Sequence, residues 1–421
     1  MPDASMLQPA VLHNPADTSA HRNIHRAPRC PAIGVLGLCT LALLSACQVT
    51  PLTPGTDPAA DSLPVPAVTE RVVPFAPVLV LAGELTPTGT ALRDRGVALF
   101  EARQDQMAFE TWLPLAEAGH PETQYNIGVL LSRGGAVPRD LTAARRWQQQ
   151  ASDAGYPPAH CALGDLLWAD RSDPLNRQRA LSAYLKGANQ DQASCMHNAA
   201  AVLLNGLAGA PDVLAGLHWL ERAAEAGNLA SQAQLGSLHL HGTYSPPEHE
   251  HALRWLTLAA DRGHVDATHD LAYMWERGLG TVADLGTAAT LYERAAAGGQ
   301  ALSANNLGLL YRNGQGVPQD HPKAVTYFEQ AVAQRNSEAM VNLGDMHYLG
   351  LGVAANPAQA AVLYQQAANA GLLWGDCRLA ALLRHGEGLP RDIPRADQLK
   401  QRVHMRMPSA DCTTPLSTLL R

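Results

Sequence analysis

Aromatic side chains are scarce in this chain of 421 residues, at 5%, although apolar residues as a whole make up 46%. A core with few aromatic rings relies on Ala and Leu, which favour close packing of helix against helix over a β-sheet. A basic stripe is also missing, and the formal net charge is −7. This charge balance argues against nucleic acid as a partner.

Catalytic signatures are missing as well. The chain contains no Gly-x-Ser-x-Gly elbow, phosphate-binding loop, His-Glu-x-x-His pair or dinucleotide fingerprint. Each of these motifs sets a nucleophile, a phosphate cradle or metal ligands at a fixed spacing. We therefore expect no enzymatic activity and no cofactor.

Residues 1–47 carry a targeting signal. Arg22, Arg26 and Arg29 precede an apolar run over residues 32–46, which is too short to span a membrane comfortably. The run ends in Leu44-Ser45-Ala46-Cys47, which resembles the lipobox of bacterial lipoproteins. The resemblance implies that Cys47 is acylated and becomes the new N-terminus. The alternatives are a cleaved signal with an incidental Cys and a short membrane anchor.

The residue after the lipobox bears on localisation. In the bacterial sorting rule an Asp at that place retains a lipoprotein at the inner membrane, whereas this chain has Gln48. We therefore expect an outer-membrane lipoprotein that faces the periplasm, with an inner-membrane lipoprotein or a secreted protein as alternatives. Cys39 is a poorer lipidation candidate than Cys47, because Leu36 and Leu38 precede it where small residues are expected.

Residues 48–88 are predicted to form a disordered tether. Proline recurs at positions 51, 54, 58, 64, 66, 74, 77 and 87. Such spacing prevents a helix or a central strand and leaves an extended, semi-rigid spacer. The alternative for its C-terminal end is that residues 78–82 dock on the folded part.

A 36-residue period governs the rest of the chain, over residues 89–408. A small residue recurs in step at Gly128, Gly164, Ala200, Gly236, Ala272, Gly308, Gly344 and Ala380. A second landmark keeps the same step at Gly119, Gly155, Gly227, Gly263, Gly299 and Gly371, with Asp191 and Arg335 in the two remaining places. A fixed period of this length predicts an array of stacked units.

Each unit is expected to contain two helices. In the sixth unit Leu307, Leu310 and Tyr311 mark one face of the first helix, and Asp320 is the N-cap of a second helix over residues 323–333. The small residue is expected to admit a large side chain from the second helix. The candidates are Trp147, Trp219, Trp255, Tyr292, Phe328 and Tyr364.

The sixth unit also carries a family resemblance. Its Leu307-Gly308-Leu309-Leu310-Tyr311, followed by Gly314-Gln315-Gly316-Val317, Asp320, Lys323-Ala324 and Tyr327-Phe328, resembles the Sel1-like repeat of the tetratricopeptide superfamily. The resemblance implies an all-α, right-handed solenoid of stacked antiparallel helix pairs. It covers one short and eight full repeats over residues 89–408, followed by a C-terminal tail over residues 409–421. The match is loose around positions 164 and 200.

A ladder of polar side chains is the candidate binding groove. Two positions, two residues before and five residues after the small residue, stay mostly polar and lie seven residues apart, hence on one face. The ladder comprises Asn126, Arg133, Asn198, Asn205, Gln234, Asp270, Arg277, Asn306, Asn313 and Asn342. In tetratricopeptide folds such residues line the concave side and bind peptide backbone or carboxylates, and an amide offers both donor and acceptor. The alternatives are a solvated face and amides bonded within the scaffold.

Histidines gather in one segment. His239, His241, His249 and His251 fall within thirteen residues, with Glu248 and Glu250 between them. Such residues are metal ligands. However, His239 occupies the position of a core Tyr in the sixth unit, and the other histidines flank an irregular loop. We therefore expect a surface loop and no metal.

Four cysteines remain in the array and its tail, and two disulfides are predicted, Cys161–Cys195 and Cys377–Cys412. Cys161 and Cys377 each lie three residues before the small residue of their unit, whereas Cys195 lies five before its own. Two residues turn a helix by about 200°, so these positions face opposite ways, as consecutive first helices must to meet. The alternative is that all four are buried free thiols.

Two functions are compatible with these features. One is a lipid-anchored scaffold of the cell envelope that binds other proteins, for example in a polysaccharide-export or secretion assembly. The other is a periplasmic ligand-binding or regulatory protein that recognises a peptidoglycan fragment or a β-lactam, since some secreted proteins with this repeat are linked to penicillin recognition. A weak hydrolase is the contrary hypothesis to a purely binding role.

Overall fold

The computed structural model describes residues 85 and 87–419, and every regular element among them is an α-helix. No helix among these residues is both long enough and apolar enough to cross a membrane. Cys47, the signal segment and almost all of the tether lie outside the described residues. The helices are α2 (Pro87–Glu101), α3 (Asp105–Glu117), α4 (Pro121–Arg133), α5 (Leu141–Asp153), α6 (Pro157–Ala169), α7 (Asn176–Ala188), α8 (Ala193–Leu204), α9 (Val213–Glu225), α10 (Leu229–His241), α11 (His249–Asp261), α12 (Val265–Arg277), α13 (Leu285–Ala297), α14 (Ala301–Asn313), α15 (His321–Ala333), α16 (Ser337–Leu349), α17 (Pro357–Asn369), α18 (Leu373–His385), α19 (Ile393–His404) and α20 (Leu416–Leu419).

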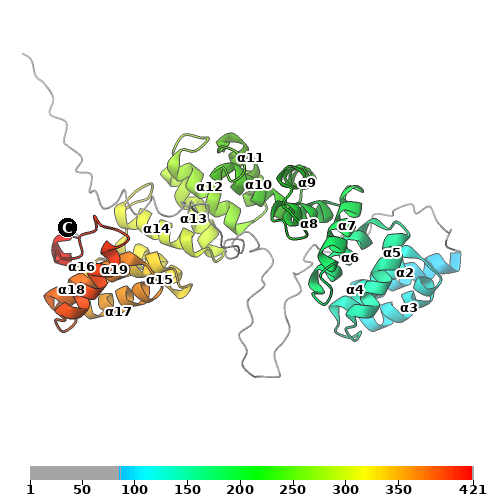
Figure 1. The fold of residues 1–421 in the computed structure, drawn as a ribbon, viewed down its shortest axis with the longest axis horizontal. Helices are drawn as coiled ribbons and strands as arrows, with labels where there is room; N and C mark the ends of the chain where they lie inside the picture. The colour runs from blue at the N-terminus through cyan, green and yellow to red at the C-terminus, as the bar shows by residue number, and fades with distance from the viewer. Residues whose placement is uncertain (1–84, 86, 420–421) are drawn as a thin grey trace, which may run out of the picture. The chain divides into compact units, whose positions relative to one another are not determined.

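The helices form consecutive pairs, from α4 with α5 to α18 with α19, and the pair α2 and α3 precedes them (Figure 1). In each pair the first helix packs against the second, and the second packs against the first helix of the next unit. First helices also contact one another directly across units, as α4 with α6, α6 with α8, α10 with α12 and α16 with α18. The fold is therefore an all-α repeat solenoid. We call its row of first helices the inner row.

The small residue sets the distance between the two helices of a unit. A Cβ atom added to Gly308 would lie 2.6 Å from the ring of Phe328, and one added to Gly344 would lie 2.5 Å from the ring of Tyr364. These contacts are closer than side-chain carbons allow, so at Gly308 and Gly344 an added methyl group would displace the ring. The residue that meets the small residue lies twenty positions after it.

The expectation for Trp147 and Trp255 was wrong by one position. The residues that meet the small residue are Gln148 at Gly128, in place of Trp147, and Leu256 at Gly236, in place of Trp255. One position turns a helix by about 100°, which directs the Trp ring to a different side of the helix. There an arginine covers it: the guanidinium of Arg254 lies 4.6 Å from the centre of the Trp255 ring.

The ends of the second helices follow the period. The closing residue has a positive φ in each unit before the last one, including Asp191 at 58° and Arg335 at 62°, where no glycine is present. At the start of six second helices an Asp or Asn side chain accepts a backbone N–H: Asp140, Asp212, Asp284, Asp320, Asn356 and Asp392. Leu175 and Glu248 occupy the N-cap position before α7 and α11 without such a bond.

The C-terminal tail packs against the last first helix. Cys412 and Leu416 are buried in the same apolar cluster as Leu379 and Leu382 of α18. The backbone oxygen of Thr413 lies 2.8 Å from Nε2 of His385 in α18. The tail therefore covers apolar side chains that the last unit would otherwise expose.

Candidate binding surface on the inner row

The polar ladder lies on the first helices, and its members differ in what they contact. Arg133 forms an ion pair with Asp105 and lies over the ring of Phe100, with 5.2 Å between the guanidinium carbon and the ring centre. Asn205 donates to the backbone oxygen of Ala201 at 2.8 Å. Gln234 and Asn306 are half-buried. Arg133 is held by an ion pair and a ring, and Asn205 by a backbone oxygen. The ladder is therefore not one uniform row of free amides.

Two other ladder residues, Asn126 and Arg277, differ from these in their contacts. Asn126 is buried, and its Nδ2 atom has no hydrogen-bond partner. Arg277 lies over the ring of Tyr273, with 5.8 Å between the guanidinium carbon and the ring centre. Asn313, in contrast, is exposed at the end of α14, where its Nδ2 lies 3.4 Å from Oε1 of Gln315.

Other ladder residues join neighbouring units. Nδ2 of Asn198 donates to Oδ1 of Asp165 in the preceding first helix at 3.0 Å. The hydroxyl of Tyr184, in the second helix of the preceding unit, donates to the same oxygen at 2.8 Å. Nδ2 of Asn342 donates to Oδ1 of Asn305 at 2.8 Å. At Asn198 and Asn342 the amides are thus bonded within the scaffold, which was the alternative that the sequence left open.

The same arrangement recurs near the C-terminal end. The hydroxyl of Tyr364 donates to Oδ1 of Asp345 at 2.7 Å, and Nε of Arg378 lies 3.3 Å from that oxygen. Asp165 and Asp345 both lie one residue after the small residue, a position that the sequence reasoning missed. A usable signal was present, because in both units a Tyr occupies the position twenty residues after the small residue.

Two carboxyl groups of this surface, those of Asp165 and Asp270, have raised pKa values. Solvent reaches the side chain of Asp165, yet the protein crowded around it raises its pKa to about 6, against the opposing effect of the Tyr184 hydrogen bond. Burial likewise raises the pKa of Asp270 to about 6, and nearby His241 and the Ser237 hydrogen bond oppose this rise.

Two disulfides join the cysteine pairs that the 36-residue phase predicts. Cys161 of α6 is bonded to Cys195 of α8, and Cys377 of α18 is bonded to Cys412 of the tail, with Cα–Cα distances of 5.2 and 4.7 Å. Other junctions use the same two positions for a hydrogen bond. His197 and Ser231 lie 2.9 Å apart through Nδ1 and Oγ, and His269 and Ser303 lie 2.8 Å apart through the same atoms.

The histidines divide between two places. Nδ1 of His241 lies 2.9 Å from the backbone oxygen of Ser237, on the inner row. His239, Glu248 and His251 instead come together where α10 ends and α11 begins, and one ligand atom from each lies within 4.8 Å of the others. The sequence had favoured a packed core position for His239, a surface loop for the other histidines and no metal.

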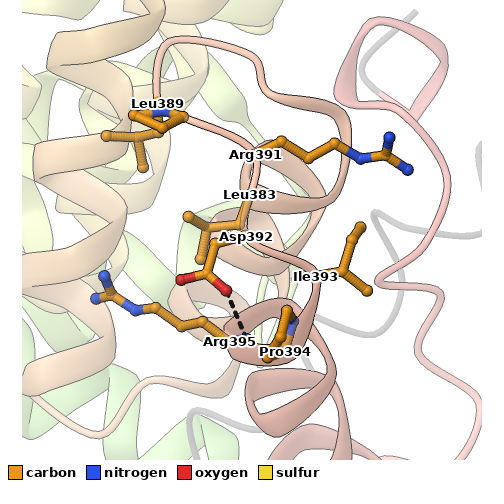
Figure 2. Close-up of a pocket in the computed structure, with 8 residues that line it drawn as sticks. Leu383, Leu389, Arg391, Asp392, Ile393, Pro394 and Arg395 are labelled. Atoms are coloured by element: carbon orange, nitrogen blue, oxygen red, sulfur yellow. Dashed lines mark hydrogen bonds between the residues drawn. The ribbon is translucent and has the colours of Figure 1, made fainter.

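A shallow pocket lies where α18 ends and α19 begins, which is the place in the last unit that is equivalent to the cluster of His239, Glu248 and His251. Leu383 and residues 389–395 line it, as Figure 2 shows. Oδ1 of Asp392 accepts the backbone N–H of Arg395 at 3.0 Å, drawn as the dashed line in Figure 2. The hydrogen bond within it is thus that of a helix cap.

Comparison with known proteins supports the repeat fold. The structure is similar to that of a protective antigen of uropathogenic Escherichia coli strains that displays an SLR fold, with a TM-score of 0.66 and 28% identity over 71% of this chain. This chain spans 64% of the length of that antigen. It also resembles a Sel1 repeat protein from Oxalobacter formigenes, with a TM-score of 0.52 and 24% identity over 76% of this chain and 91% of the other. Comparison with curated proteins finds no match.

The family assignment rests on the repeats themselves. The Sel1 repeat model matches residues 121–156, 193–228, 229–264, 265–300, 301–336, 337–372 and 376–396, which together make up more than half of the chain. The matches do not include residues 157–192, one of the two units in which the sequence pattern is loose, but they include residues 193–228, the other one. The chain belongs to the Sel1 repeat family.

Proposed function

We propose that this protein is a lipid-anchored scaffold of the bacterial cell envelope that binds partner proteins along the inner row. The Sel1 repeat fold is that of a protein–protein interaction scaffold, and the family is in general non-catalytic. The envelope setting and the lipid anchor rest on the sequence of residues 1–47, in which Cys47 ends a lipobox-like motif. We propose a place in a polysaccharide-export or secretion assembly, with an outer-membrane anchor.

The observation that carries the binding role is the row of polar side chains along the first helices of the inner row. The carboxyl groups of Asp165 and Asp270, crowded by protein, lie on the same helix faces as the ladder amides. Amide side chains supply both donor and acceptor atoms to a peptide backbone, and carboxylates accept from its N–H groups. An extended segment of a partner protein is therefore the ligand that fits this surface best.

The amides that remain open to a partner are unevenly distributed. Asn313 is exposed, whereas Asn342 is already bonded to Asn305 and the half-buried Asn306 accepts a hydrogen bond from Nδ2 of Asn305 at 3.5 Å. A partner that uses Asn342 must share or replace that bond. Because a single hydrogen bond contributes only about 0.5–1.5 kcal/mol, single substitutions are expected to have small effects.

The test is to crosslink the protein to its partners in intact cells and identify them by mass spectrometry. The wild-type chain is then compared with the triple variant Asn306→Ala, Asn313→Ala and Asn342→Ala. We expect the triple variant to lose the partner while its helix content stays the same. The matched control replaces three exposed glutamines of second helices, Gln149, Gln150 and Gln366, by Ala, and should retain the partner.

Normal recovery of the partner by the triple Asn variant would refute the inner row as the binding surface. Recovery of no protein partner, together with saturable binding of a muropeptide or a β-lactam, would favour the periplasmic ligand-binding function instead. Release of the wild-type protein from membranes without detergent would contradict the anchored setting but leave the binding surface open to the same test.

A further inference from the structure

Three positions of each unit converge where the first helix ends and the second begins. They lie three, twelve and fifteen residues after the small residue, and we call them the corner. In the sixth unit they are Tyr311, Asp320 and Lys323. Nζ of Lys323 lies 5.1 Å from the centre of the Tyr311 ring and 3.8 Å from Oδ2 of Asp320. Figure 2 shows the corner of the last unit, formed by Leu383, Asp392 and Arg395.

In the unit of α10 and α11 the corner residues are His239, Glu248 and His251. Nδ1 of His239 lies 3.1 Å from Oε2 of Glu248, and Nδ1 of His251 lies 3.3 Å from the same oxygen. The two imidazole rings meet edge to face, with 5.3 Å between their centres. Three groups that ligate metals thus occupy the corner of this unit. In other units the first corner position carries a ring or an aliphatic chain, the second usually carries a helix cap, and the third carries a small, cationic or amide side chain.

Glu248 also does not cap its helix, which is the role of the equivalent residue in most other units. In six other units the residue twelve after the small residue is an Asp or Asn that caps the second helix, as Asp320 does by accepting the N–H of Lys323 at 3.0 Å. The Glu248 side chain makes no such bond. The loss of a cap destabilises a helix. In the corner, the Glu248 carboxylate contacts only the two histidines.

We propose that His239, Glu248 and His251 form a binding site for a divalent transition metal, with Zn²⁺ as the best fit. Tetrahedral ligands at about 2.0–2.1 Å from Zn²⁺ lie about 3.3 Å from one another. The two nitrogen–oxygen distances of this corner match that edge length. Two imidazoles and one carboxylate suit Zn²⁺, Cu²⁺ and Ni²⁺, whereas Mg²⁺ and Ca²⁺ prefer oxygen ligands alone.

The site is anchored on one side and open on the other. The His239 side chain is 20% exposed, against 47% for Glu248 and 66% for His251. Three protein ligands leave a tetrahedral metal one position for water or for a side chain of a partner. A bound metal would tie the start of α11 to the end of α10 and so replace the missing cap.

The site is tested with the purified full chain, equilibrated with Zn²⁺ and measured by calorimetry and by elemental analysis. The decisive variant is His239→Tyr, Glu248→Asp and His251→Lys, which gives this corner the residues of the sixth unit and so should fold. We expect the wild-type chain to bind one Zn²⁺ through the corner, and the triple variant to bind it at least about 100-fold more weakly. The unfolding temperature without metal should be no lower in the variant, because the shorter Asp restores the cap.

The matched control is His347→Tyr, at the same position in α16, where Asn356 and Gln359 complete the corner. It should leave Zn²⁺ binding unchanged. Equal Zn²⁺ affinity in the wild-type chain and the triple variant would overturn the proposal, and so would the absence of saturable Zn²⁺ binding by the wild-type chain. Addition of Mg²⁺ or Ca²⁺ in place of Zn²⁺ should give no binding that depends on these three residues.

Discussion

Gly187 of α7 lies directly against the sulfur of Cys195 in α8, so that a Cβ atom at position 187 would overlap that sulfur. The same added atom would lie 3.0 Å from Cβ of Cys195 and 3.1 Å from Cβ of His160. The glycine therefore makes room for the Cys161–Cys195 disulfide at the junction between two units. It lies in a helix, where Ala would otherwise be the more stable residue.

Gly187→Ala is expected to lower stability, because the added methyl group overpacks this junction. Overpacking of a closely packed core costs typically about 1–3 kcal/mol, which exceeds the gain of up to about 1 kcal/mol in helix propensity. The measurement is the unfolding temperature under oxidising conditions. Gly286→Ala is the control, because the nearest atom to its added Cβ is 3.3 Å away. An unchanged unfolding temperature for Gly187→Ala would show that the junction has space to spare.

The second prediction concerns the bond between Cys377 and Cys412. Closing a loop with a sequence separation of 35 contributes roughly 3–4 kcal/mol through the unfolded state. Because an array unfolds from its ends, Cys412→Ser should speed hydrogen exchange in α18, α19 and α20 and leave α12 and α13 unchanged. Non-reducing peptide mapping of the wild type should recover both disulfides. Four alkylatable thiols would refute the pairing.

The third prediction concerns anchoring. Cys47→Ser should prevent incorporation of labelled fatty acid and move the protein out of the membrane fraction, because acylation requires the thiol. Cys39→Ser, eight residues earlier in the sequence, should change neither result. Label in the Cys47→Ser protein would refute the assignment of the lipobox.

The fourth prediction concerns pH. The pKa of Asp165 rises from its ordinary value of 3.8 to about 6 in the folded chain. The folded state then binds this proton more tightly than the unfolded state, so its stabilising effect is complete below about pH 4 and is lost as the pH rises through 6. Asp165→Asn keeps an acceptor for Tyr184 and Asn198 and removes this pH dependence.

We therefore expect the unfolding temperature of Asp165→Asn, relative to wild type, to be higher at pH 7 than at pH 4.5. The exposed carboxylate of Asp153 provides the comparison, and Asp153→Asn should show no such trend. Parallel pH profiles for Asp165→Asn and the wild type would mean that crowding at the inner row does not act on this carboxyl group.

The helix pairs, their order and their connections follow from the sequence. A strict period of 36 residues fixes which residues are equivalent, so the cap at Asp320 implies the caps at Asp140, Asn356 and Asp392. The same period sets the angle of each residue around its helix. For this reason the phase of Cys161 and Cys195 predicts their pairing, although 34 residues separate them.

Tertiary packing decided what the period leaves undefined, which is where the end of each side chain lies. Gln148, and not its neighbour Trp147, meets Gly128, because a difference of one position turns the side chain by about 100°. Asn198 is bonded to Asp165 because two consecutive first helices lie close enough for their side chains to meet. The binding role of the ladder stays a prediction, since the sequence shows which face is polar but not which of its atoms the scaffold already uses. His239, Glu248 and His251 belong to two helices and a loop, and only the packing of α10 against α11 brings their ligand atoms to one point.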